Sequence, residues 1–265
     1  MARRSYNRVG EVNKNKFGTN MIVIEDLGQN PKMVIVEFQD DFKYKIKTQY
    51  GAFKDGRVKN PYDKEVCNVG YVGHGKYNKT LHPHIYREWY HMLKRCYDPY
   101  YINKELTYKD CYVCDEWLNF QNFAKWYEEN YYKCNDEKME LDKDILCKGN
   151  KIYSPQNCCF VPKRINALFT KRDKNRGIYP IGVYLHKDVR SKHKSLVVQL
   201  NILNNDGKKE RKYLNSFSIN KPFQAFVCYK NAKEDYIKQV ADEYRSLIPN
   251  KLYEAMYKYE VEIND

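Results

Sequence analysis

Residues 139–166 read MELDKDILCKGNKIYSPQNCCFVPKRIN, and this stretch combines two strand-like segments with the start of a helix. LDKDIL and NCCFVP are short apolar runs, whereas the segment between them, CKGNKIYSPQ, is rich in turn-forming residues. KRINALF follows directly and is typical of the beginning of a helix. The sequence therefore predicts two short strands followed by a helix.

This arrangement can bring Asp142, on the first strand, close to Asn166, on the helix. Two oxygen ligands on rigid elements leave coordination positions open for water and phosphate, which suits a hard ion such as Mg²⁺ or Mn²⁺. A metal ion held there can polarise a scissile phosphate and stabilise the leaving oxygen. We therefore expect a candidate metal site at these two residues.

Two helical patterns precede the stretch. In HIYREWYHMLKRCYDP the apolar positions recur at helical spacing, and Asp98 and Pro99 supply a stop signal. A second, strongly aromatic helix is predicted at about 115–131, where Asp115 and Glu116 suit a helix N-terminus. Its aromatic rings are interpreted as core residues rather than as a binding surface.

With its upstream helices, the stretch resembles the ββα-metal motif of HNH endonucleases, in the branch found in phages and mobile elements. The resemblance implies metal-dependent hydrolysis of DNA, as in nicking or homing endonucleases. Residue by residue, Asp142 matches the first metal ligand, Asn157 the residue that orients the general base, and Asn166 the ligand from the helix. Lys143 stands where that family has its general-base histidine.

The lysine at position 143 is the main departure from the family. A Lys side chain with its ordinary pKa of about 10.4 is protonated at pH 7 and cannot accept a proton from water. Lys143 is better interpreted as a phosphate-binding cation. Asp144 or a histidine from the preceding helical segment, namely His82, His84 or His91, is a candidate replacement for the base. The alternative is a protein that keeps the HNH scaffold without cleaving.

The segment before these helices has a different pattern. NMIVIED, KMVIVEFQD and FKYKIKTQY alternate in hydropathy and are separated by turn signals, which predicts a small twisted sheet or barrel in residues 1–80. The glycine-rich GYVGHG at residues 70–75 lacks the context of a phosphate-binding loop and is interpreted as a linker or tight turn.

Residues 176–265 predict three antiparallel strands packed on one long helix at about 222–247. This unit resembles the ethylene-response-factor type of DNA-binding domain, whose sheet reads DNA bases in the major groove. Asn215 stands where that family has Gly, and its sheet tryptophans are absent. The predicted nucleic-acid-binding residues are Arg190, Lys192, Gln199, Asn201, Lys208, Lys209, Arg211 and Lys212.

The expected fold class is therefore α+β, in three parts. They are a small N-terminal β domain at residues 1–80, a helical and ββα module at 81–175, and the three-stranded sheet with its helix at 176–265. The formal net charge of +13 favours a polyanionic partner, which we expect to be double-stranded DNA. RNA bound through a tyrosine-rich surface, or a host protein, is the alternative.

Cysteine usage and hydropathy bear on the compartment. Nine Cys without a signal-like apolar start indicate a reducing cytoplasm, and apolar runs such as MIVI are too short to span a membrane. Cys111 and Cys114 form one CxxC pair without a second pair of suitable spacing. Buried thiols are therefore favoured over a structural Zn²⁺ site.

Overall fold

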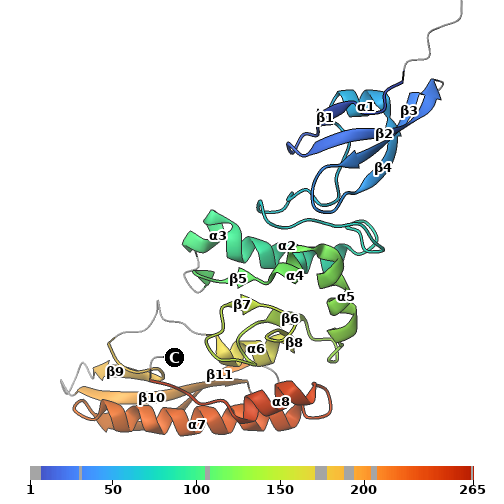
Figure 1. Ribbon diagram of the computed structural model, residues 1–265. Coiled ribbons are helices and arrows are strands. Elements are labelled where there is room, and N and C mark those ends of the chain that lie inside the picture. Colours follow the sequence, from blue (N-terminus) through green and yellow to red (C-terminus); the bar gives the residue numbers. More distant parts are fainter. Residues whose placement is uncertain are drawn as a thin grey trace, which may run out of the picture. The chain divides into compact units, whose positions relative to one another are not determined.

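The computed structural model describes residues 7–29, 32–104, 108–170, 178–187, 194–203, 208–263 and 265 (Figure 1). Helices and antiparallel sheets are both present, so the predicted α+β class is confirmed. The chain divides into two compact units. The first comprises residues 1–129 and 152–154, and the second comprises residues 130–151 and 155–265. The division into three parts stays a prediction.

The first unit begins with a four-stranded antiparallel sheet in which each strand pairs with the next along the chain. Alternating apolar residues of two central strands face one side and are completely buried, including Met21, Val36 and Phe38. Phe53, from a short helix, closes this core. The elements are β1 (Val12–Lys14), β2 (Asn20–Gln29), β3 (Lys32–Phe38), β4 (Lys45–Gln49) and α1 (Tyr50–Lys54).

The glycine-rich segment after this sheet is a tight turn packed against a helix. Gly70 pairs with Val66 in an isolated bridge. A Cβ atom on Gly70 would lie 2.4 Å from Cδ1 of Leu93 and 3.0 Å from the ring of Trp89. Glycine is therefore required at this position because the backbone approaches two buried side chains closely.

Helix α2 (Pro83–Tyr97) matches its prediction and buries Ile85, Trp89 and Met92 on one face. The second predicted helix is divided into α4 (Asp115–Leu118) and α5 (Phe120–Asn130). Asn119 interrupts it with extended backbone, and forms a parallel bridge with Tyr71. Three short elements complete the unit: α3 (Pro99–Lys104), β5 (Tyr112–Val113) and β7 (Ile152–Tyr153).

The second unit contains the predicted pair of strands and helix. Strand β6 (Met139–Asp142) pairs antiparallel with β8 (Cys159–Pro162), and Asp142 lies opposite Cys159. Helix α6 (Lys163–Phe169) follows β8 without a gap and contacts both strands. The ββα arrangement expected from residues 139–166 is thus present.

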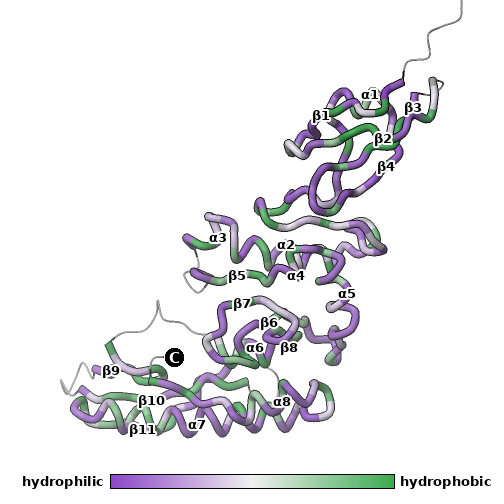
Figure 2. The backbone as a smooth tube through the Cα atoms, in the orientation of Figure 1, coloured by the Kyte–Doolittle hydropathy of each residue, from purple (hydrophilic) through white to green (hydrophobic). Residues whose placement is uncertain are grey.

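The rest of the second unit is a sheet in the order β11–β10–β9, packed on a long helix (Figure 1). Leu196, Val198 and Leu200 of the middle strand are buried, and the helix alternates between polar and apolar residues (Figure 2). The long helix ends at Glu243, earlier than predicted, and a further helix follows Pro249. The elements are β9 (Val183–Lys187), β10 (Lys194–Leu203), β11 (Lys209–Ser218), α7 (Pro222–Glu243) and α8 (Asn250–Tyr257).

Candidate functional site

Asp142 is the last residue of β6 and is fixed by the loop that follows it. Its Oδ1 accepts backbone N–H groups from Asp144 at 2.9 Å and from Ile145 at 2.7 Å. Burial, together with the neighbouring carboxylate of Asp144, raises the pKa of Asp142 to about 6. A cation bound at this position would therefore compensate a negative charge that the protein holds in an unfavourable environment.

Asn166 lies on the same side of the strand pair as Asp142. Its Nδ2 donates a hydrogen bond of 2.6 Å to Oε2 of Glu140. Glu140 and Asp142 are two residues apart on β6 and so point to the same face, whereas Met139 and Leu141 are buried on the other. Because the amide nitrogen of Asn166 is engaged by Glu140, its oxygen is the atom that could bind a metal ion.

Lys143 is 7% exposed, and its ammonium group is held by two acceptors. Nζ donates to Oδ2 of Asp144 at 2.9 Å and to the carbonyl oxygen of Asn150 at 3.1 Å. An ammonium group in this position has no lone pair with which to accept a proton. The geometry therefore favours a structural cation that neutralises Asp144, rather than the exposed phosphate contact expected from the sequence.

Asn157 reaches Lys143 through a second asparagine. Its Nδ2 donates to Oδ1 of Asn150 at 3.1 Å, and Nδ2 of Asn150 donates to the carbonyl oxygen of Lys143 at 2.6 Å. Asn157, which we expect to orient the general base, is thus connected through Asn150 to the backbone of Lys143. Asn150 was not predicted, because its role depends on a loop that brings residues seven apart into contact.

The histidines proposed as replacement bases belong to the first unit, and the ββα residues belong to the second. The rings of His82 and His84 pack edge-on against Tyr77 and Tyr127, with centroids 5.2 and 5.8 Å apart. Burial and the nearby Arg95 lower the pKa of His91. The ring contacts give His82 and His84 packing roles within their own unit, whereas His91 is exposed.

The predicted nucleic-acid-binding residues are divided between two faces of the C-terminal sheet. Asn201 pairs with Arg211 and Leu203 with Lys209, so Arg211 and Lys209 point to the same face as Asn201. Gln199 shares this face. We call Gln199, Asn201, Lys209 and Arg211 the open-face residues.

The remaining basic residues are not part of this group. Lys212 pairs with Leu200 and therefore points to the side of the sheet that packs on α7. Lys208 is exposed and precedes the first residue of β11. Arg190 and Lys192 lie outside the described residues. A register shift between Val198 and Gln199 helps to set these positions.

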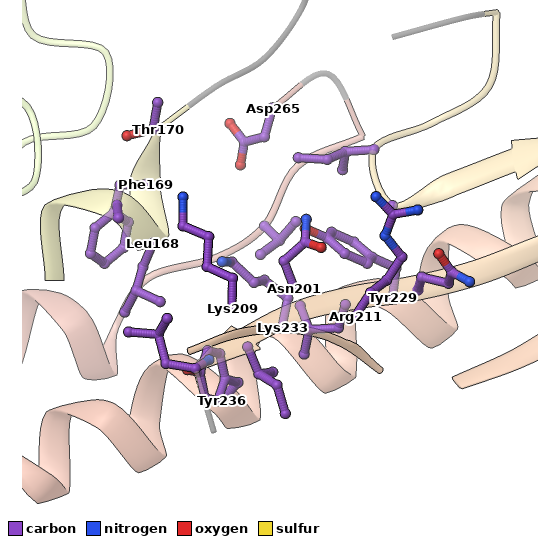
Figure 3. Close-up of a pocket in the computed structure, with 18 of the residues that line it drawn as sticks. Leu168, Phe169, Thr170, Asn201, Lys209, Arg211, Tyr229, Lys233, Tyr236 and Asp265 are labelled. Atoms are coloured by element: carbon purple, nitrogen blue, oxygen red, sulfur yellow. The ribbon is translucent and has the colours of Figure 1, made fainter. Parts of the chain in front are cut away.

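The open-face residues line a cavity of about 1090 Å³. Its wall also includes side chains from α6, α7 and the C-terminal segment. Lys209, Asn201 and Arg211 extend to one side of β10, toward Thr170 and Asp265 (Figure 3). The face expected to lie open against DNA is therefore one wall of a concave site.

No protein-family model, curated protein or solved structure matches this chain. Within the described parts of the chain, no group of three or more His, Cys, Asp or Glu side chains could hold a metal ion. The candidate site at Asp142 and Asn166 is of another kind, since it combines one carboxylate with one amide. None of the described helices is both long and apolar enough to cross a membrane.

Proposed function

We propose that this protein binds double-stranded DNA and hydrolyses phosphodiester bonds with the help of Mg²⁺ or Mn²⁺, in the manner of HNH endonucleases. The observation that carries the proposal is the anchoring of Asn166 to Glu140, on the face of β6 that also carries Asp142. An amide oxygen and a carboxylate oxygen then lie on one side of the strand pair, as a hard metal ion requires.

The residues present fit such an ion. Asp142 and Asn166 would hold it through oxygen atoms, and the raised pKa of Asp142 supports a site that gains from a positive charge. When bound, the ion supplies Lewis-acid stabilisation of charge on the phosphate oxygens. Asn157 and Asn150 fix the loop at Lys143, and Lys143 in turn fixes Asp144.

A second candidate is a nucleic-acid-binding protein that keeps this scaffold but does not cleave. It is favoured by the pairing of Lys143 with Asp144, because no proton acceptor then stands in the position of the family's histidine. General-base catalysis contributes about 10²- to 10⁴-fold in rate, so its loss leaves slow cleavage or none. In either case we propose an intracellular, cytoplasmic protein whose main partner is DNA.

The test is nicking of supercoiled plasmid over a wide range of Mg²⁺ and Mn²⁺ concentrations. Wild type is compared with Asp142→Asn and with Asp235→Asn, an exposed aspartate on α7 that serves as the matched control. We expect nicked product from wild type and from the control, and none from Asp142→Asn. If all three proteins give the same background but retard duplex DNA, the non-cleaving candidate is correct.

A further inference from the structure

The cavity in the second unit is large enough for a small organic ligand. Its volume of about 1090 Å³ is slightly above the range of about 300–1,000 Å³ that is usual for ligand sites. Strand β9 pairs with β10 only as far as Val198, and Gln199 donates its backbone N–H to the carbonyl oxygen of Gly182 at 3.1 Å. Beyond this point, β10 has no strand partner on that side among the described residues. The cavity is lined by residues 199–203 of β10, which include this uncovered stretch, and by residues 180–184.

Among the cations that line the cavity, Lys209 and Arg211 on β11 and Lys233 on α7 have no carboxylate partner among the described residues. Of the three carboxylates in the wall, two are engaged elsewhere, and the third, Glu210, lies opposite Ile202 and so points to the other face of the sheet from Lys209 and Arg211. Asp265 accepts a hydrogen bond from Lys148 at 2.7 Å, and Glu137 accepts one from Tyr244. The excess of unpaired positive charge indicates an anionic ligand.

Lys233 is the most informative of the three. It follows Tyr229 by four residues and precedes Tyr236 by three, so it lies on the buried side of α7 with these two rings. Burial lowers its pKa to about 8. A buried, charged lysine without a partner destabilises the folded protein, and a bound anion would reduce this cost.

The rest of the wall combines hydrogen-bonding groups with aromatic rings. Asn201 projects into the same space as the cations (Figure 3). The hydroxyl of Tyr236 accepts the backbone N–H of Leu203 at 2.8 Å, which fixes that ring against the end of β10. Phe169 packs edge-on against Tyr259 with centroids 4.7 Å apart. Cations beside an amide and flat apolar surfaces suit a ligand that carries both a phosphate and a planar ring.

We propose that this cavity binds a nucleotide, with Lys209 and Arg211 on the open face and Lys233 on α7 as cationic contacts for its anionic groups. The nucleotide is either free or one unit of a single-stranded nucleic acid. The site uses none of the residues of the ββα metal site, so it goes beyond the proposed cleavage. A protein with an inactive metal site would still bind nucleotides here.

The proposal is tested by isothermal titration of the full chain in phosphate-free buffer. The probes are adenosine monophosphate, adenosine triphosphate, a short 5′-phosphorylated deoxythymidine oligonucleotide, and inorganic phosphate. Lys233→Met keeps the length of the side chain and removes its charge. Lys238→Met, on the same helix and outside the cavity, is the matched control.

We expect at least one nucleotide probe to bind wild type and Lys238→Met alike, and to bind Lys233→Met at least tenfold more weakly. Binding of the mononucleotides identifies a free nucleotide as ligand, whereas binding of the oligonucleotide alone identifies a strand. The proposal is overturned if no nucleotide probe binds, or if Lys233→Met and Lys238→Met bind the probe equally well. It is also overturned if inorganic phosphate binds wild type as tightly as the nucleotide probes do. Asp142→Asn should bind the same probe unchanged, which separates this result from failure of the cleavage proposal.

Discussion

Nδ2 of Asn166 donates a hydrogen bond of 2.6 Å to Oε2 of Glu140, and this contact joins helix α6 to strand β6. The strand ends two residues later at Asp142, and the hydrogen bond restrains the rotation of the Asn166 side-chain amide on the face of β6 that carries Asp142. Glu140 therefore acts on the proposed metal site by orienting one of its ligands.

Replacing Glu140 with Ala should weaken metal binding. Loss of a residue that orients a ligand usually lowers metal affinity by about 10- to 100-fold, and we expect a decrease near the lower limit because only one ligand is affected. The measurement is a titration with Mn²⁺, followed by the electron paramagnetic resonance signal of the free ion. Glu129→Ala, an exposed glutamate of the first unit, is the control. Equal affinities for the two variants would show that Glu140 has no part in the site.

Lys143→His should increase plasmid nicking. An imidazole can accept a proton near pH 7, so we expect a gain of about 10²-fold over wild type if the metal site is functional. The exposed Lys133→His serves as the control for an added histidine elsewhere. A folded Lys143→His protein that binds Mn²⁺ and DNA without any gain in nicking would argue for the non-cleaving candidate.

Stability should depend on pH through Asp142. Its pKa is raised to about 6 in the folded protein, so the folded state binds its proton more tightly than the unfolded state does. The resulting stabilisation is complete below about pH 4 and is lost as pH rises through about 6. Asp142→Asn removes this dependence and should stabilise the metal-free protein at pH 7 by about 1–3 kcal/mol.

The check is urea unfolding of wild type and Asp142→Asn at pH 5 and pH 7.5, both with a chelator present. The difference between the two proteins should be larger at the higher pH, where Asp142 is ionised. If the difference in unfolding free energy between the two proteins is the same at pH 5 and pH 7.5, the ionised carboxylate of Asp142 is not destabilising.

The two faces of the C-terminal sheet should contribute unequally to DNA binding. Arg211 belongs to the open-face residues, whereas the adjacent Lys212 points to the opposite side. Arg211→Ala should weaken duplex binding and reduce the slope of log affinity against log salt concentration by about 1, as expected for one lost phosphate contact. Lys212→Ala is the matched control and should alter the slope less. Fluorescence anisotropy between about 50 and 200 mM salt measures both.

Gly70→Ala should destabilise the first unit. The added methyl group would lie 2.4 Å from Cδ1 of Leu93 and 3.0 Å from the ring of Trp89, and both of these side chains are fully buried. Overpacking of this kind costs about 1–3 kcal/mol. Gly51→Ala is the control, because a Cβ at that helical position meets nothing within 4 Å. The measurement is the melting temperature in thermal unfolding. An equal decrease in Gly70→Ala and Gly51→Ala would contradict this explanation.

Much of the secondary structure follows from local pattern. The alternation in residues 20–38 and the helical spacing in residues 83–97 produce the expected strands and helix, because each pattern lets neighbouring residues bury one face. The break at Asn119 does not follow from local pattern. It depends on pairing with Tyr71, which is distant in sequence, so a continuous helix was predicted there.

In the candidate sites, too, some features follow from the sequence and others depend on tertiary contacts. The sequence by itself predicted two strands followed by a helix that carry Asp142, Lys143, Asn157 and Asn166 in this order, and it determined that the C-terminal segment is basic. Only the tertiary structure decided that Lys143 is paired with Asp144, because the ion pair depends on how the loop folds back.

The tertiary structure also decided which cations of the sheet share a face. The pairing of Arg211 with Asn201 and of Lys212 with Leu200 puts these consecutive residues on opposite faces. Among the described residues, β9 pairs with β10 only as far as Val198. Lys233 reads in the sequence as an ordinary polar residue of an amphipathic helix. It becomes part of a basic cavity only because α7 packs against β10.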